Sequence, residues 1–566
     1  MRIGLLTEGG YPYATGEARL WCDRLVRGLP QHEFELYALS RSAEQEERGR
    51  VPLPAHVTRV LTAPLWAPAD DGRSYGRRER RRFAAAFTEL VRGICGADAG
   101  RFADGLYALA ELAGEQGGLC AALRSETAVR AVESACRAPG ASRTVQRVQV
   151  ADLLEFVDEL ERLLRPLSLD WYEDLREVDV CHAAAGGVAA LPGLLAKRFF
   201  GVPLLVTEYG VQLRAHYLEQ PAPGERPAVR ALLAAFHTRL AGEIYAQADL
   251  LTPGNAHARR WQERCGAPRE RLRTVYPGME ADRFAAVGEE TSCGDPDTLV
   301  WIGRIEPAKD LIALLHAFAE VRRSEPAARL RIFATSVAAG EASVQYLADC
   351  RSLAAQLFPD EAADAHAVGE NPVTFEVIGA PEAPSAADAY GAGRVVVLSS
   401  VIEGFPITLV EAMFCGRATV STDVGAVCEV IGGTGLVVPP RNPRALAEAC
   451  VSLLRDPERA QRLGAAARAR ALELFTVEQN VEAFQESYLR LLARGPARPD
   501  GATTGVPFEQ PPEARVPGRW ATPTWAVLPA STQSASTLPA STQSASTQSA
   551  STLPEGTPLT SSEVSG

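Results

Sequence analysis

The chain has 566 residues, of which 46% are hydrophobic and 23% are charged; this is a globular composition that excludes a collagen-like fibre, a disulfide-rich miniprotein and a wholly disordered chain. The net charge of −12 argues against binding of nucleic acid by the chain as a whole. The eleven cysteines stand singly, without a C-x-x-C pair, as in reduced cytoplasmic proteins. The short apolar run at the N-terminus and the lack of a long apolar segment predict neither a signal peptide nor a membrane span.

The first 60 residues alternate between strand and helix patterns. Residues 3–6 and 34–39 are apolar runs of strand length, and apolar residues recur at helical spacing between them, from Ala18 to Leu29. This order predicts a parallel sheet covered by helices. The alternation stops at 66–165, where an Ala- and Leu-rich pattern predicts a helical insertion. Its arginines at 77–82 are expected to form a solvated helix face, with docking on an acidic membrane as the alternative.

The strand and helix alternation resumes after the insertion and continues through a second series. Expected strands of the first series lie at 178–182, 203–207 and 249–253, and residues 272–275 close this half. Expected strands of the second series lie at 298–302, 329–334, 373–377, 394–398 and 417–421. We therefore expect an N-terminal Rossmann-like domain over 1–280, a C-terminal one over 281–475 and a final helix over 476–495. Residues 496–566 are rich in Pro, Ser, Thr and Gly, which predicts a disordered tail.

Two acidic residues flank the start of an expected helix in the second series. Glu403 begins the segment Glu403-Gly-Phe-Pro406 after the strand at 394–398, and seven residues separate it from Glu411. Ligands of parallel sheets bind at the carboxyl ends of the strands, and a helix N-terminus attracts a phosphate. The pair could therefore accept hydrogen bonds from sugar hydroxyls, or it could be two surface glutamates beside a helix start.

Two further loops of the second series follow expected strands. Gly303 permits a tight turn, and Arg304 and Lys309 come after it; two cations beside such a turn could hold a diphosphate, or the loop could be merely solvated. The chain has only two lysines, Lys197 and Lys309. The third loop is Thr422-Asp-Val-Gly425. Each loop is a weak signal alone, but the three together favour one ligand site.

These residues, in this order, resemble the retaining glycosyltransferase family 4. The N-terminal segment Leu5-Leu-Thr-Glu-Gly-Gly-Tyr-Pro-Tyr13, with Trp21, resembles the PelF-type branch, whose members build bacterial exopolysaccharide from UDP-sugars. The resemblance covers about 1–60 and 170–490. It implies a GT-B fold: two Rossmann-like parallel-sheet domains facing a cleft, with the helical insertion in the first.

The resemblance also implies roles for the site residues. Arg304 and Lys309 would stabilise the departing UDP phosphates in place of a metal ion, so that neither a metal nor a cofactor is expected. Glu403 would contact the donor sugar, and Glu411 would hold the ribose hydroxyls. The donor-binding residues that the resemblance implies are Gly16, Gly303, Phe405, Pro406 and Glu411.

The first half departs from the family pattern at two positions. Glu17 stands where relatives carry a second glycine after Gly16, so it would bring bulk and negative charge towards the donor phosphates. Tyr209 stands where relatives often carry histidine, and tyrosine cannot carry a proton near neutral pH. His182 is a further candidate for the sugar or acceptor side, with packing at a strand end as the alternative.

The sequence favours a transferase that moves a sugar from a nucleotide sugar, UDP-linked, to a growing glycan. Its expected partners are the donor, a glycan acceptor and membrane-embedded export proteins, with no nucleic acid, and its expected location is the cytoplasm, peripherally at the inner face of the membrane. The rival is a degenerate relative that binds a nucleotide sugar or assembles without turnover. Another GT-B enzyme, such as an epimerase or a phosphorylase, agrees less well with the spacing of Glu403 and Glu411.

Overall fold

The computed structural model describes residues 1–14, 19–67, 71–96, 98–218, 226–290, 294–336, 341–359 and 371–494. Residues Met1–Pro496 form one compact unit. The tail predicted over 496–566 lies outside the described residues, as do Gly16 and Glu17. Within the described ranges, no helix combines the length and apolar character needed to cross a membrane.

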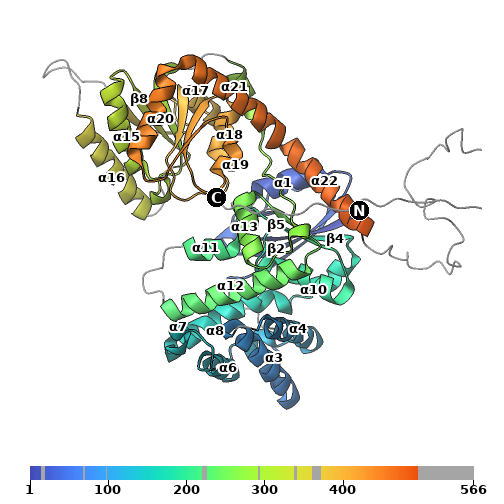
Figure 1. Cartoon of the computed structure of the whole chain (residues 1–566). Coiled ribbons are helices and arrows are strands. Elements are labelled where there is room, and N and C mark those ends of the chain that lie inside the picture. The colour runs from blue at the N-terminus through green and yellow to red at the C-terminus, as the bar shows by residue number, and fades with distance from the viewer. Residues whose placement is uncertain are drawn as a thin grey trace, which may run out of the picture. The chain divides into compact units, whose positions relative to one another are not determined.

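Two six-stranded parallel sheets organise this unit (Figure 1). The first sheet has the order β3-β2-β1-β4-β5-β6 and the second has the order β12-β11-β10-β7-β8-β9. The strands of the first sheet are β1 (Arg2–Glu8), β2 (Glu33–Ser40), β3 (Val57–Pro64), β4 (Val180–Ala183), β5 (Leu204–Glu208) and β6 (Leu250–Pro253). The strands of the second sheet are β7 (Asp295–Gly303), β8 (Arg329–Ala334), β9 (Val373–Val377), β10 (Gly393–Leu398), β11 (Ala418–Thr422) and β12 (Leu436–Val438).

Helices cover both faces of each sheet. Along β7, Leu299 and Trp301 belong to one buried cluster and Val300 and Ile302 to another, because successive side chains of a strand point to opposite faces. The helices after β7 are α15 (Leu311–Ser324), α16 (Glu341–Leu357), α17 (Ala386–Gly391), α18 (Ile407–Phe414), α19 (Val427–Ile431), α20 (Pro443–Arg455), α21 (Pro457–Leu474) and α22 (Val477–Arg494). The two clusters make this a doubly covered sheet of the kind expected.

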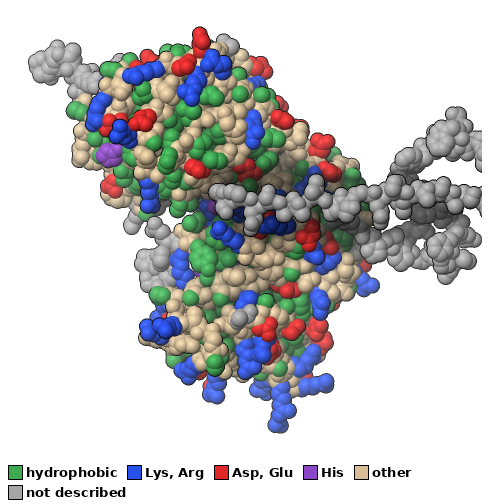
Figure 2. All heavy atoms as spheres, viewed as in Figure 1, with side chains coloured by type: hydrophobic (Ala, Val, Ile, Leu, Met, Phe, Trp, Pro, Cys, Tyr) green, Lys and Arg blue, Asp and Glu red, His purple; other side chains and the backbone are tan. Residues whose placement is uncertain are grey.

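The helices of the first half include the predicted insertion, whose main helices are α3 to α8. The helices before β7 are α1 (Arg19–Gly28), α2 (Ala43–Glu47), α3 (Arg77–Cys95), α4 (Ala99–Gln116), α5 (Leu119–Leu123), α6 (Glu126–Cys136), α7 (Arg143–Gln146), α8 (Val150–Leu164), α9 (Trp171–Asp174), α10 (Leu191–Phe200), α11 (Gln212–Leu218), α12 (Pro227–Gln247), α13 (Ala256–Arg264) and α14 (Ala285–Glu289). In α3, Phe83, Phe87, Leu90, Val91 and Ile94 are buried at helical spacing. The arginines at 77–82 are exposed, and Figure 2 shows basic side chains at this end of α3.

Two edge strands, β3 and β12, were not expected from the sequence. Residues 272–275, which close the first half, form no strand, and Leu272 makes one isolated bridge with Leu251. Strand β3 was not expected because it lies at the sheet edge, where its partly exposed residues lack an apolar run. Strand β12 has only 3 residues and lies at the edge of the second sheet.

Candidate functional site

The predicted donor loops meet where the strand order of the second sheet reverses. Strands β7 and β10 are neighbours, and their carboxyl ends lead into the loops that carry Lys309 and Glu403. Lys309 Nζ forms an ion pair with Glu403 Oε1, and the Ser400 hydroxyl donates a hydrogen bond of 2.8 Å to the same oxygen. The two side chains are 14% and 10% exposed. The structure therefore brings together a cation and a carboxylate that the sequence separates by 94 positions.

Backbone contacts hold these two loops against each other. The Ser399 hydroxyl donates to the Lys309 carbonyl at 2.7 Å, and the Val401 amide donates to the Ala308 carbonyl at 2.9 Å. Asp310 follows Lys309 with a φ of +48° and caps α15, where its side chain accepts from the Ala313 amide. The position of Lys309 is thus fixed by its own chain as well as by Glu403.

The third predicted loop supports the Glu403 turn from behind. Gly425 has a φ of +59°, and a Cβ at this position would lie 2.5 Å from the Glu403 carbonyl oxygen. The Ala426 amide donates to the Gly404 carbonyl at 3.1 Å, and the Thr422 hydroxyl donates to the Ser400 carbonyl at 2.6 Å. Only glycine fits this approach without strain.

Glu411 lies on α18, about two turns beyond Glu403. Its Oε2 accepts a hydrogen bond of 2.8 Å from the Tyr390 hydroxyl of α17. Burial raises the pKa of Glu411 above its ordinary value, and the hydrogen bond from Tyr390 acts in the opposite direction. The other carboxyl oxygen of Glu411 can accept a hydrogen bond from a hydroxyl group of a ligand.

The other predicted donor residues that the structure describes lie in or directly beside the same two loops, after β7 and β10. Arg304 is more exposed, at 60%, and its Nη2 lies 3.7 Å from Glu306 Oε1. Gly303 ends β7 and Pro406 caps α18. The ring of Phe405 packs on Phe475, with 5.7 Å between the ring centroids. Arg304 is therefore a surface cation, whereas Lys309 is held within the loops.

A residue of the first half also reaches this site. Arg214 of α11 is half-buried, and its Nη2 donates to the Glu403 carbonyl at 2.7 Å. Burial lowers its pKa, and the charge of Glu403 partly offsets this shift. A second hydrogen bond also joins the two halves of the chain: the Ala256 amide donates to the Glu429 carboxylate at 2.7 Å. No role at the donor site was expected for Ser400 and Tyr390, and only the place of Ser400 two residues after β10 could have indicated one.

The structure corrects the interpretation of His182. The side chain is 0% exposed, its Nδ1 lies 2.7 Å from the Tyr488 hydroxyl and its Nε2 lies 2.7 Å from Thr207 Oγ1. Burial lowers the pKa of His182 to about 3. The position in a ligand cleft was wrong, because α22 covers this histidine and both ring nitrogens have protein partners; the packing alternative is the one observed.

Tyr209 is also tied to α22. Its hydroxyl accepts a hydrogen bond of 3.0 Å from Asn480 Nδ2, and its ring packs edge-on against Trp21 at 5.1 Å. Burial raises its pKa. The role of Tyr209 on the sugar side stays a prediction, and its described contacts are structural.

No group of three or more His, Cys, Asp or Glu side chains among the described residues is arranged to hold a metal ion. Metal independence stays a prediction. It rests on the cations of the donor loops and not on the lack of a metal-binding group.

Comparisons with known proteins agree with this arrangement. Residues 1–270 match a model described as a domain of unknown function (DUF3492), and residues 296–456 match the model of glycosyl transferases group 1. The chain is 31% identical over 255 residues to a D-inositol 3-phosphate glycosyltransferase of Nocardia farcinica, covering 44% of this chain and 53% of that protein. It is 30% identical over 357 residues to the protein of the same name from Geodermatophilus obscurus, covering 59% of this chain and 69% of that protein.

A solved structure shares the fold. Anabaena HepE in complex with UDP and glucose has a TM-score of 0.50 and 14% identity, covering 87% of this chain and 100% of that chain. The Nocardia match spans only about half of that relative's length, at 53%, so the similarity is to part of it. With its two parallel sheets in the GT-B arrangement, the chain belongs to the glycosyl transferase group 1 family.

Proposed function

We propose that this chain is a retaining glycosyltransferase that moves a sugar from a UDP-linked donor to a glycan without a metal ion. The observation that carries the proposal is the placement of Lys309, Ser400 and Glu403 at the point where the strand order of the second sheet reverses. The family membership and the UDP and glucose bound to HepE support the same reading.

The proposed chemistry follows from the charges at this point. Breaking the bond between the sugar and the diphosphate leaves negative charge on the phosphate oxygens, and a fixed ammonium group stabilises that charge. Lys309 has three N–H donors, of which the ion pair with Glu403 uses one, so the others remain for phosphate oxygens. Arg304 would add a second cation from the exposed side of the loop.

In this proposal, the carboxylates of Glu403 and Glu411 accept hydrogen bonds from hydroxyl groups of the donor. Glu403 would accept from sugar hydroxyls beside the reacting carbon, while the backbone of Phe405 and Pro406 lines the same side. Glu411 would accept from the ribose hydroxyls, with Tyr390 fixing its orientation. The proposed division of the chain gives 1–280 to the acceptor and 281–475 to the donor.

The finer part of the proposal is that the chain belongs to the PelF-type branch and acts in exopolysaccharide synthesis. It would work in the cytoplasm beside membrane-embedded export proteins. The exposed arginines at 77–82 are the surface that would meet an acidic membrane (Figure 2).

A donor screen tests the function. UDP-, GDP- and ADP-linked sugars are offered to the full chain, thermal shift reports binding, and NMR reports transfer, hydrolysis and the anomer released after exhaustive chelation. We expect turnover of a UDP-sugar with the anomeric configuration retained. Binding without turnover across a broad acceptor panel would instead identify the degenerate relative, and turnover that returns only with Mg²⁺ or Mn²⁺ would contradict metal independence.

A further inference from the structure

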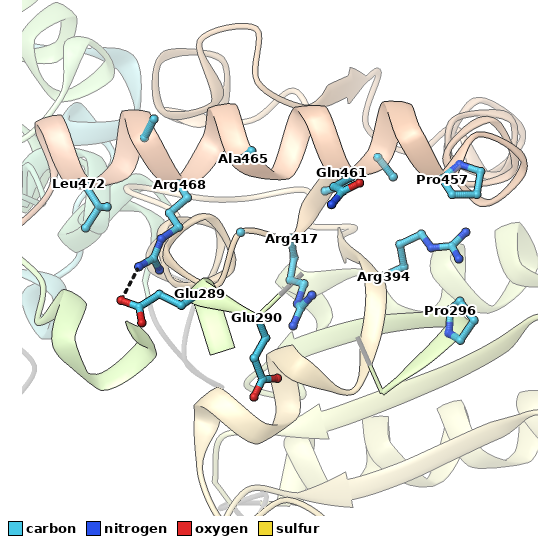
Figure 3. Close-up of a pocket in the computed structure, with 15 residues that line it drawn as sticks. Glu289, Glu290, Pro296, Arg394, Arg417, Pro457, Gln461, Ala465, Arg468 and Leu472 are labelled. Carbon is cyan, nitrogen blue, oxygen red and sulfur yellow. Dashed lines mark ion pairs between the residues drawn. The ribbon is translucent and has the colours of Figure 1, made fainter. Parts of the chain in front are cut away.

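A cavity of about 630 Å³ lies at the amino ends of the strands of the second sheet, the edge opposite to the donor loops (Figure 3). Pro296 at the start of β7, Arg394 at the start of β10 and Ala418 at the start of β11 form its floor, and α21 forms its roof. The size is within the range of small-molecule sites. Nothing in the proposed transfer reaction uses this edge of the sheet.

Three arginines from different elements line the cavity: Arg394 of β10, Arg417 just before β11 and Arg468 of α21. Figure 3 shows Arg417 between the other two, below α21. Arg417 is only 6% exposed and therefore buried, whereas Arg394 and Arg468 are partly exposed. Small residues of the roof, Ala460, Ala465 and Ala469, leave the space beneath them open. The alanines thus form an apolar side of the cavity, and the polar side holds the three arginines together with two acidic residues, Glu289 and Glu290.

The known contacts of two of these arginines leave donors for a ligand. Arg394 Nη1 donates to the Leu454 carbonyl at 3.2 Å, and Arg468 Nη1 donates to the Phe414 carbonyl at 2.6 Å. These bonds cap the last turns of α20 and α18, which is a structural role. Each bond uses one of the five N–H groups of a guanidinium, so capping and ligand binding are compatible.

One arginine of the cavity already forms an ion pair with an acidic side chain. Glu289 Oε1 lies 3.7 Å from Arg468 Nη2, drawn as the dashed line in Figure 3. The Glu289 side chain is 75% exposed, and an ion pair this exposed contributes little free energy. A ligand with more negative charge than one carboxylate can displace it, because a guanidinium binds phosphate oxygens in pairs.

We propose that this cavity binds a small phosphorylated molecule, at a site separate from the donor loops. The phosphate group would lie between Arg394, Arg417 and Arg468, and the uncharged part would lie under the alanines of α21. The site contacts Phe414, the last residue of α18, whose other end begins beside Glu403. The inference does not depend on which sugar the chain transfers.

Calorimetric titration with inorganic pyrophosphate tests the site in the full chain. UDP is kept saturating to occupy the donor loops, and potassium chloride at equal ionic strength serves as the blank. We expect saturable binding that weakens about 10-fold in Arg394→Gln and in Arg417→Gln, since a charged hydrogen bond contributes about 1.5 kcal/mol or more. Arg444→Gln, an exposed arginine of α20 paired with Glu448, is the matched control and should bind as the wild type does.

One further variant makes the result decisive. Lys309→Ala separates the sites, because it should leave pyrophosphate binding in the cavity unchanged. If Arg417→Gln melts below the assay temperature because its side chain is buried, Arg394→Gln decides alone. The proposal is overturned if no heat is measured in the UDP-saturated protein, if both arginine variants bind as tightly as the wild type, or if only Lys309→Ala loses binding.

Discussion

The two sheets of this chain differ in how deeply the polar residues near their strand ends are buried. In the second sheet, Lys309 and Glu403 meet in loops and keep part of their side-chain surface exposed, while Ser400 beneath them is buried. In the first sheet, His182 and Thr207 are fully buried and bonded to each other. The same sequence pattern, a polar residue at the end of an apolar strand, produced a candidate ligand site in one half and a packed core in the other.

Helix α22 is the cause of this difference. Its Tyr488 contacts His182 across 306 positions of sequence, and its Asn480 contacts Tyr209 across 271. Phe484 of the same helix stacks on Trp21. A polar side chain under such a cover is satisfied by the protein, so its residue type carries no information about ligands.

The largest expected effect is on the second sheet. Lys309→Ala removes the partly buried cation proposed to stabilise the leaving diphosphate, and turnover should fall about 10²-fold or more. Steady-state kinetics with the best UDP-sugar measures it. Lys197→Ala removes the other lysine of the chain, which pairs with Asp249 beside the first sheet, and should change only stability. Equal turnover in Lys309→Ala and wild type would contradict the assignment.

The first sheet should respond to pH through its stability and not through ligand binding. Because the pKa of His182 is lowered to about 3, the folded chain binds this proton less readily than the unfolded chain, whose histidine titrates near 6.5. The stabilisation is complete above about pH 6.5 and is lost as the pH falls towards 3, by about 1.4 kcal/mol per unit.

Denaturant unfolding at several pH values checks this expectation. Between about pH 6.5 and 4.5, the free energy of unfolding of the wild type should fall more steeply than that of His182→Gln, by about 2–3 kcal/mol in total. Identical slopes would show that His182 is not buried as a neutral side chain.

Arg214 sharpens the comparison because it comes from the first half and contacts the second. Its bond to the Glu403 carbonyl should position that turn, so Arg214→Ala should lower kcat about 10-fold and leave the UDP Kd nearly unchanged. Arg214→Lys should recover part of the loss, and Arg259→Ala of α13 is the matched control. A fall in UDP affinity as large as the fall in kcat would mean that Arg214 binds the diphosphate itself.

The smallest effect concerns Glu411. Because burial raises the pKa of Glu411, it takes up a proton earlier than an ordinary carboxyl group as the pH falls, and a protonated carboxyl group accepts hydrogen bonds weakly. UDP affinity should therefore decrease a few-fold in the acid range. In Glu411→Gln the affinity should be lower at neutral pH and respond less to acid, which titration calorimetry at matched pH values can show.

The sequence predicted the second sheet better than the first for a physical reason. The carboxyl ends of neighbouring parallel strands meet at one edge, so placing Lys309 and Glu403 after their strands was enough to bring them together. The partners Arg214 and Tyr390 lie 189 and 21 positions from the residues they contact, and no local pattern reports such pairs. The prediction for His182 was wrong for the same reason, since the residues that bury it belong to α22, the last described helix.

The central claim is that the donor diphosphate binds where the strand order of the second sheet reverses. A crystal structure of the full chain with UDP tests it most directly. We predict phosphate oxygens within about 3 Å of Lys309 Nζ, with the ribose beside Glu411 and with His182 still bonded to Tyr488. UDP bound against the first sheet, with α22 displaced from His182 and Lys309 still bonded to Glu403 alone, would contradict the account.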